Sequence, residues 1–263
     1  MNRKRISGIS TRELLIIAIP TLLIGLLVFG VAYHYVLPAP PPTLVMSTGM
    51  AGGSSEAFGE RYRRLLARDQ VHLDLWPSEG SVENLKRLTD RSTGVDVGFV
   101  MGGSGSGAET KLVSLGAICY MPFWVFYRSD RTYDDLSQLK GKRISIGPEG
   151  SSVRKFALDL LKASRAAAPP TVLLDLTITA GVQALTDGKV DVVIIFSTAD
   201  NALVQKLLYA PGIKLMNFSQ AEAYSRLFPA LSHVILPKGI LDLEKKIPPS
   251  ENTSTLSGER SSG

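Results

Sequence analysis

The chain has 263 residues, of which 44% are hydrophobic and 20% charged, and this composition excludes an intrinsically disordered protein. Its net charge is +5, but four basic residues lie within the first 12 positions, so the rest of the chain is close to neutral. No cluster of Lys and Arg interleaved with aromatic residues follows, which excludes a nucleic-acid-binding surface.

The first predicted element is an apolar helix from Leu14 to Tyr33, which contains no charged residue. Its length is close to the roughly 20 residues that cross a bilayer, whereas the apolar core of a signal peptide has only about 7 to 15. No A-x-A cleavage site follows, so an uncleaved anchor over residues 14–37 is favoured over a signal peptide. Because residues 1–13 are basic, the N-terminus is expected in the cytoplasm and the remainder in the periplasm of a bacterium, held at the inner membrane by a single span. The proline-rich residues 38–42 predict a stiff spacer.

From residue 43 onward, short strands alternate with helices. Strands are predicted at 43–47, 71–76 and 95–100, and helices at 54–67 and from Ser81 to about residue 89. After a long apolar stretch, residues 112–128, a second series predicts strands at 143–147, 172–179 and 190–196, with helices at 151–163 and 181–186. This order implies an α/β fold with parallel sheets and right-handed crossovers.

Two segments in the two series read alike, "SVENLKRLTDRSTGVDVGFV" and "GVQALTDGKVDVVIIF". Each runs from a helix beginning near Val through Leu and Asp into a V-D-V strand. The similarity indicates two related lobes, with chance similarity of helix-to-strand segments as the alternative. The apolar stretch between the lobes holds the single cysteine, Cys119, which is expected to be a buried, inert thiol.

Three predicted strand-to-helix turns carry Gly followed by Ser, at Gly52–Ser55, Gly80–Ser81 and Gly150–Ser152. Ligands of parallel α/β sheets bind where such turns lie, and free N–H groups at helix N-termini attract anions. Simple helix capping, with Ser81 as an N-cap, is the alternative for each turn. The residues predicted to bind a ligand are Met50, Gly53, Ser54, Ser55, Ser81, Asn84, Ser151, Ser152 and Arg154.

Two of these residues leave the choice open. Arg154 lies in the first turn of its helix, where it either clamps a carboxylate or is a solvated surface arginine. Asn84 either contacts a ligand or faces solvent. The aromatic residues of the stretch between the lobes favour a core over a ligand-stacking role, and they are Tyr120, Phe123, Trp124, Phe126 and Tyr127.

The sequence offers no set of catalytic or metal-binding residues. The glycine-rich stretch Phe99–Thr110 fails the G-x-G-x-x-G pattern and favours a flexible or ligand-facing loop. His72 and His233 are isolated, and no G-x-S-x-G occurs. We therefore expect a protein that is not an enzyme and that holds no cofactor and no metal.

Several blocks together resemble one family: "STGMAGGSSEAFG", "SEGSVENLKRLTD", "VDVGFV", "DLSQLKGKRISIGPEGSSVRKFALDLL" and "GVQALTDGKVDVVII". Over residues 43–236 the chain resembles the TAXI branch of the solute-binding proteins of TRAP transporters. The resemblance implies the two-lobed type II periplasmic-binding-protein fold, with lobe 1 at 43–118, a hinge and lobe 2 at 119–232, and a return toward lobe 1 at 233–249. Residues 250–263 are polar and predicted to be a disordered tail, so the C-terminal part of the fold is expected to be truncated or altered.

The resemblance also implies a function. An extracytoplasmic receptor would capture a small organic anion, such as a glutamate-like amino acid, a dicarboxylate or an oxo-acid, and present it to TRAP membrane subunits. A membrane-tethered sensor, or a structural protein that keeps the fold without transport, is the alternative.

Overall fold

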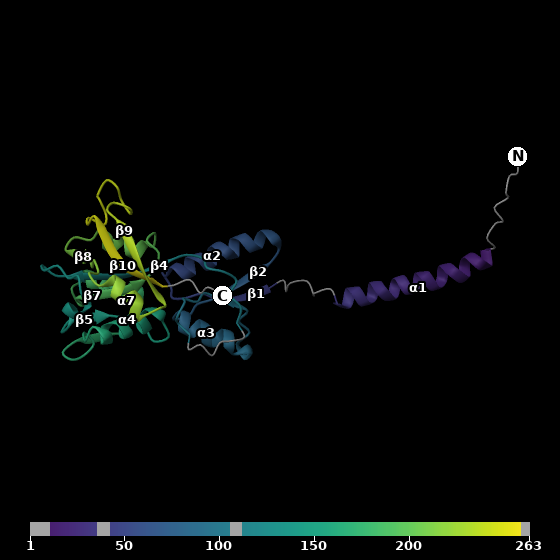
Figure 1. Cartoon of the computed structure of the whole chain (residues 1–263), viewed down its shortest axis with the longest axis horizontal. Coiled ribbons are helices and arrows are strands. Elements are labelled where there is room, and N and C mark those ends of the chain that lie inside the picture. The colour runs from purple at the N-terminus through teal and green to yellow at the C-terminus, as the bar shows by residue number, and fades with distance from the viewer. Residues whose placement is uncertain (1–10, 36–42, 106–111, 259–263) are drawn as a thin grey trace. The chain divides into compact units, whose positions relative to one another are not determined.

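The computed structural model describes residues 11–35, 43–105 and 112–258 (Figure 1). The chain divides into two units, Met1–Pro41 and Pro42–Gly263, and each is described by itself. The basic N-terminal segment up to residue 10 and the predicted spacer at 38–42 lie outside the described residues.

The first unit contains one helix, α1 (Thr11–Tyr35), which includes Pro20. The hydroxyl of Thr21 donates to the Ile17 carbonyl at 2.8 Å, beside the turn where the proline has no N–H to give. Residues Leu15–Tyr33 have a mean hydropathy of 2.7 and are long and apolar enough to cross a membrane. A signal sequence near the N-terminus satisfies this criterion of length and composition as well.

Lobe 1 of the second unit is a parallel sheet in the order β2-β1-β3, with helices between its strands. The pairing sets Thr43 opposite His72 and Met46 opposite Val97. The first two strands agree with the sequence prediction, whereas the third is shorter than predicted. The elements are β1 (Thr43–Ser47), α2 (Ser54–Leu66), η1 (Ala67–Asp69), β2 (His72–Trp76), α3 (Ser81–Thr89), η2 (Arg91–Thr93) and β3 (Val97–Gly98).

Lobe 2 is a seven-stranded mixed sheet in the order β6-β5-β7-β4-β10-β9, with β8 also paired to β4. Its helix α5 begins three residues earlier than predicted, because the strand predicted at 172–179 ends at Leu174. The elements are β4 (Met121–Arg128), η3 (Leu136–Leu139), β5 (Arg143–Ser145), α4 (Ser152–Ala163), β6 (Val172–Leu174), α5 (Ile178–Thr186), β7 (Val192–Phe196), α6 (Ala202–Leu208), β8 (Ile213–Leu215), α7 (Ala221–Leu227), β9 (Leu231–Pro237) and β10 (Asn252–Gly258).

The two lobes share one topological unit. In lobe 1 the chain runs β1-α2-β2-α3-β3 with the strand order β2-β1-β3, and in lobe 2 it runs β5-α4-β6-α5-β7 with the order β6-β5-β7. All four strand pairings in these units are parallel. The similarity between the helix-to-strand segments therefore reflects equivalent positions, since they form α3-β3 and α5-β7.

Strand β4 is the centre of the lobe 2 core. Phe123 and Tyr127 face one buried cluster, whereas Trp124 and Phe126 face the other. A strand buried on both faces reads as a continuous apolar run, and this explains the stretch seen in the sequence. The indole N–H of Trp124 donates to the Ser197 carbonyl at 2.7 Å, which ties β4 to the loop after β7. These four aromatic residues are core residues, as predicted.

The segment before β4 differs from its prediction. Tyr120 is 56% exposed and Cys119 is exposed, although both were expected in the core. The two residues precede the strand, so no neighbouring strand covers them. Partial burial, together with the charge of Asp200, raises the pKa of the Cys119 thiol.

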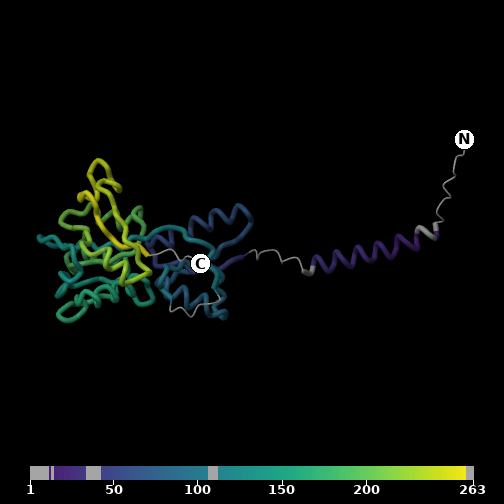
Figure 2. The backbone as a smooth tube through the Cα atoms, in the orientation of Figure 1, coloured from purple at the N-terminus to yellow at the C-terminus, as the bar shows by residue number. Residues whose placement is uncertain are grey.

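The C-terminal residues also correct the prediction. Residues 252–258 form β10, which pairs antiparallel with both β4 and β9, and residues 231–237 form β9 of the same sheet instead of returning to lobe 1 (Figure 2). Leu256 is fully buried, and the hydroxyl of Thr255 donates to the Phe123 carbonyl at 2.6 Å. Threonine and serine hydroxyls that bond to the backbone let a polar sequence form an interior strand, which hydrophobic patterning does not detect.

Candidate ligand site between the two lobes

Asn84 of α3 joins the ends of the three strands of lobe 1. Its amide nitrogen donates to the carbonyls of Thr48 and Phe99, at 2.9 and 2.7 Å. Its carbonyl oxygen accepts from the hydroxyls of Ser47 and Ser78. The side chain is fully buried, so it does not face solvent, and each of its hydrogen-bonding groups has a partner within the protein. Asn84 holds the loops of the site in place.

Ser81 is not the N-cap of α3, because Gly80 occupies that position with a φ of +133°. The Ser81 hydroxyl accepts a hydrogen bond from the backbone N–H of Met101 at 3.0 Å instead. This bond joins the start of α3 to the loop after β3. The alternative role of Ser81 as an N-cap does not hold, because glycine adopts the required backbone conformation more readily than serine.

Ser151 is the N-cap of α4. Its hydroxyl accepts from the backbone N–H of Arg154 at 3.2 Å and donates to the Pro148 carbonyl at 2.6 Å. Ser152, the first residue of the helix, is buried beside it. The capping role that the sequence left open is therefore filled at this turn.

The N-termini of α3 and α4 meet across the junction of the lobes. The backbone N–H of Glu83 donates to the Gly150 carbonyl at 3.2 Å. A β-carbon added to Gly80 would lie 3.3 Å from the Cα of Ser151. Two helix ends with partial positive charge therefore lie side by side, which favours negative charge nearby.

A second contact between the lobes forms at the N-terminus of α2. The Ser54 hydroxyl lies 2.7 Å from the Ser197 hydroxyl and 2.8 Å from the Thr198 hydroxyl, and it accepts from the Thr198 N–H. The Asn201 amide donates to the Gly52 carbonyl at 2.8 Å. In this structure, the predicted ligand residue Ser54 therefore binds the opposite lobe.

The other predicted residues of this turn shape its backbone. The N–H of Gly53 donates to the Met50 carbonyl at 3.0 Å, and Gly53 is the N-cap of α2. Ser55 lies half-buried on the first turn of the helix, close to Gly49.

Arg154 forms an ion pair with Asp175, which follows β6. Their side chains are 27% and 55% exposed, so the pair lies at the edge of the site. Arg154 is therefore not an isolated surface arginine. A guanidinium already held by a carboxylate has the geometry that would hold the carboxylate of a ligand.

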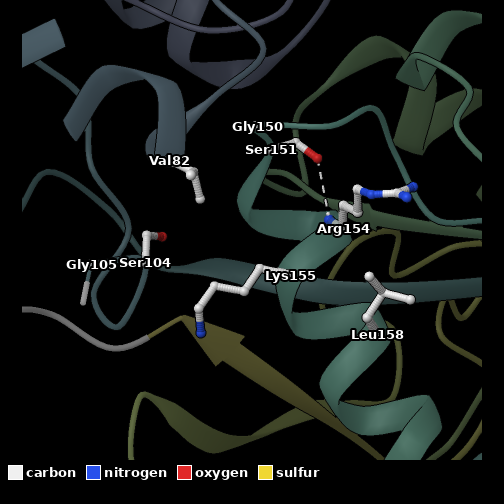
Figure 3. A pocket seen from close by; sticks show the side chains of 8 residues that line it. All are labelled: Val82, Ser104, Gly105, Gly150, Ser151, Arg154, Lys155 and Leu158. Atoms are coloured by element: carbon white, nitrogen blue, oxygen red, sulfur yellow. Dashed lines mark hydrogen bonds between the residues drawn. The ribbon is translucent and has the colours of Figure 1, made fainter. Parts of the chain in front are cut away.

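A pocket of about 310 Å³ opens between α3, the loop after β3 and α4 (Figure 3). It brings together Ser151 and Arg154, which were predicted to bind a ligand, with Ser104 from the stretch Phe99–Thr110, for which a ligand-facing loop was one of the two predicted roles, and with Lys155, which was not singled out. The residues that line it are Val82, Ser104, Gly105, Gly150, Ser151, Arg154, Lys155 and Leu158.

The structure adds site residues that the prediction missed. Asp175 follows β6, and Ser197 and Thr198 follow β7, at the carboxyl ends of parallel strands. The rule that selected the Gly-Ser turns applies equally to these positions. They lack the glycine that marked the other turns, so they were not selected.

Histidines and acidic residues in the described ranges do not assemble into a metal site. Within residues 11–35, 43–105 and 112–258, no three His, Cys, Asp or Glu side chains lie close enough to hold an ion. The His233 ring bonds to the Ser254 hydroxyl at 3.1 Å and thereby links β9 to β10.

Comparison with solved structures gives several similar proteins. An ancestral arginine-binding protein bound to arginine is 16% identical, with a TM-score of 0.49 over 67% of this chain and 79% of that one. The alkanesulfonate-binding protein SsuA from Xanthomonas axonopodis pv. citri bound to MOPS is 21% identical, with a TM-score of 0.46 over 68% and 61%. The substrate-binding protein of an amino acid ABC transporter is 15% identical, with a TM-score of 0.45 over 84% and 86%. A search of curated protein sequences finds no significant match.

The two related parallel units and the mixed sheet around β4 form a two-lobed α/β fold, as the sequence predicts. The match to a known sequence family covers residues 46–249, which is more than half of the chain. The chain belongs to the NMT1-like family.

Proposed function

We propose that this protein is an extracytoplasmic solute-binding receptor that captures a small organic anion between its lobes and presents it to a membrane transporter. The observation that carries the proposal is the meeting of the α3 and α4 N-termini at Gly80 and Ser151. Two helix ends with partial positive charge, one on each lobe, favour an anion that bridges them. Membership of the NMT1-like family and the two-lobed fold agree with this role.

The ligand site proposed here uses the residues singled out in the sequence, except that Asn84 and Ser81 act by positioning. In the proposed complex the backbone turns at Met50–Gly53 and Gly150–Ser152 contribute N–H groups, and Ser54, Ser55, Ser151 and Ser152 contribute hydroxyls. Binding then requires the Gly53 N–H to leave the Met50 carbonyl and the Ser151 hydroxyl to leave the Pro148 carbonyl. The guanidinium of Arg154 releases the Asp175 carboxylate and binds the ligand carboxylate in its place. When a ligand enters, Ser54 gives up its contacts with Ser197 and Thr198, since in this structure those contacts occupy its hydroxyl.

The assignment to one class of transporter and one class of ligand rests on the sequence resemblance. We assign the protein to the TAXI branch, with TRAP membrane subunits as its partners and a glutamate-like amino acid, a dicarboxylate or an oxo-acid as its ligand. Helix α1 is proposed to remain as a single span in the bacterial inner membrane, with the N-terminus in the cytoplasm and the lobes in the periplasm.

The Arg154–Asp175 pair provides the test. The full-length chain in lipid nanodiscs is titrated calorimetrically with glutamate, succinate and 2-oxoglutarate. Arg154→Ala should weaken binding of the best ligand by at least about tenfold, because a hydrogen bond to a charged group is lost. Asp175→Asn should strengthen it, because the guanidinium no longer has to leave a carboxylate.

Arg226→Ala is the matched control, since Arg226 pairs with Glu222 on α7 in the same manner. It should leave the affinity unchanged. If none of the three anions and no small monocarboxylate binds the parent protein, the proposed function is wrong, whereas binding of a monocarboxylate alone overturns only the assignment to these three ligand classes. If one binds and both Arg154→Ala and Asp175→Asn leave its affinity unchanged, the role of Arg154 is wrong.

The second candidate function is a membrane-tethered sensor, which the length of α1 favours. A tethered receptor diffuses only in the plane of the membrane, and this suits signalling to a fixed partner. Deleting the gene should abolish uptake of the bound anion if the protein serves a transporter, and should leave uptake intact if it serves only as a sensor.

A further inference from the structure

Ser104, in the loop after β3, has a buried hydroxyl that lacks a hydrogen-bond partner among the described residues. The residue is only 6% exposed, and within the part of the chain that the structure describes its Oγ has no hydrogen-bond partner. Figure 3 shows this oxygen directed into the pocket, toward α4. Buried polar atoms in proteins almost always have a partner, so an orphaned one at a pocket wall points to a ligand.

The loop holds Ser104 in place. Its backbone N–H donates to the Met101 carbonyl at 3.2 Å, and the N–H of Met101 is held by the Ser81 hydroxyl. Gly103 packs so closely on lobe 2 that an added β-carbon would lie 2.1 Å from the Ala230 Cβ. Ser104 therefore cannot turn to solvent unless the loop moves, and its hydroxyl is preorganised for whatever enters the pocket.

The rest of the wall defines the chemistry of the ligand. Val82 and Leu158 supply apolar surface. The Lys155 ammonium lies 4.8 Å from the centroid of the Phe156 ring and 3.5 Å from an Asp159 oxygen, a looser pairing than that of Arg154 with Asp175. In Figure 3 the Lys155 side chain extends from α4 toward the side where Ser104 lies, whereas Leu158 lies further along the helix.

We propose that this pocket binds a small monocarboxylate with a short aliphatic chain. The carboxylate accepts hydrogen bonds from Ser104 and Lys155 and takes the place of Asp175 at Arg154, which lines the same pocket, and the chain lies on Val82 and Leu158. A volume of about 310 Å³ is at the small end of ligand pockets, which begin at about 300 Å³. The inference rests on the proposed function, and it narrows the ligand to an anion that is charged at one end only.

The test uses the full-length chain in nanodiscs and hexanoate as the probe, with succinate, glutamate and neutral hexanamide for comparison. Calorimetry should show hexanoate binding more tightly than the other three. Ser104→Ala should lower the affinity for hexanoate at least about tenfold, because it removes a hydrogen bond to a charged group. Lys155→Gln should lower the affinity for hexanoate and leave the affinity for hexanamide unchanged. Ser137→Ala, at an exposed position on η3 outside the pocket, should have no effect.

Thermal unfolding without ligand gives a second measurement. Ser104→Ala should melt at the same temperature as the parent or higher, because no protein hydrogen bond is lost. A lower melting temperature would show that the hydroxyl has a protein partner, and would overturn the proposal. If Ser104→Ala does not fold, the same conclusion follows, and Lys155→Gln then tests the carboxylate contact.

Different results would overturn the assignment of this pocket and the proposed function. Hexanoate binding that is equal in the parent, Ser104→Ala and Lys155→Gln overturns the assignment of this pocket. Binding of succinate or glutamate without hexanoate also overturns it and leaves the proposed function standing. If no anion of the panel binds, both are wrong.

Discussion

Gly80 of lobe 1 and Ser151 of lobe 2 touch through their backbones, so a β-carbon at position 80 would lie 3.3 Å from the Cα of Ser151. The φ of Gly80 is +133°, a conformation that residues with a side chain rarely adopt. The same glycine therefore allows the close contact between the lobes and adopts the unusual backbone conformation at this turn.

Gly80→Ala should therefore lower the free energy of unfolding by about 1 to 3 kcal/mol, through backbone strain and the clash with lobe 2. Urea denaturation measures the loss. Gly94→Ala is the matched control, because Gly94 has a φ of +72° but no atom within 4 Å of an added β-carbon. If both variants lose the same amount, the contact at Ser151 makes no contribution.

Asn84→Ala should cost about 3 kcal/mol of stability, because it leaves buried hydroxyls and carbonyls without partners. Chemical denaturation checks the value. Gln183→Ala, which removes an exposed amide on α5 bonded to Asp187, should change stability by no more than about 0.5 kcal/mol. A loss at Asn84 as small as that at Gln183 would mean that the three strand ends of lobe 1 are held by other contacts.

Leu256→Ala should destabilise the protein by about 2 to 5 kcal/mol, since Leu256 is fully buried in β10. Thermal or urea unfolding detects the effect. Leu243→Ala changes a leucine that is 84% exposed and should be nearly neutral. Equal stability of the two variants would mean that residues 250–258 are a disordered tail, as their composition indicates, and not a packed strand.

Arg143 and Asp191 link β5 to β7 and predict a dependence on pH. Hydrogen bonds from the guanidinium lower the pKa of Asp191 below its ordinary 3.8. Because the pKa is lower in the folded state, the pair stabilises the fold above the ordinary value, and this contribution is lost as pH falls through the folded pKa. Asp191→Asn should lower the urea midpoint at pH 7, and its midpoint should approach that of the parent only as pH falls from 3.8 through the lower folded pKa. Asp130→Asn, an exposed control after β4, should follow the parent throughout.

The proposed membrane anchor predicts the fate of a reporter fused after Pro42. Such a fusion should be periplasmic and remain in the membrane fraction, because the apolar span is longer than the core of a signal peptide. Fractionation and N-terminal sequencing measure this. Recovery in the soluble periplasm with a new N-terminus shortly before Thr43 would identify α1 as a cleaved signal, and the proposed ligand binding would be unaffected.

Hydrophobic periodicity was sufficient to predict the strands β1, β2, β5 and β7 and the helices between them. Each is a short apolar strand or an amphipathic helix, and the topology of the lobes follows from their order. Strand β10 was missed because its buried positions, apart from Leu256, are mostly Thr and Ser, and hydroxyls such as that of Thr255 bond to backbone carbonyls. The composition of a segment does not reveal whether such partners are present.

The sequence predicted where the candidate site lies better than it predicted which groups its side chains contact. The Gly-Ser turns do lie where the lobes meet, but the partners of Ser54 and Arg154 are 143 and 21 residues away along the chain. Asn84 shows the same limit, since its four partners come from three different strand ends. Local sequence shows which side chains can bond and not which groups the fold brings to them.

The place of β10 within its sheet bears on the order in which lobe 2 is made. In the order β7-β4-β10-β9, and among the residues that the structure describes, residues 231–237 join the rest of the sheet only through residues 252–258. While the chain emerges from the ribosome or a translocon, β9 has no neighbour, and β4 keeps an open edge at Met121–Phe123 until β10 arrives. Closing this sheet joins segments more than 120 residues apart, a slow step that leaves unpaired edges exposed to other chains. A chain held back until β10 has emerged would therefore be protected from pairing with its neighbours during synthesis.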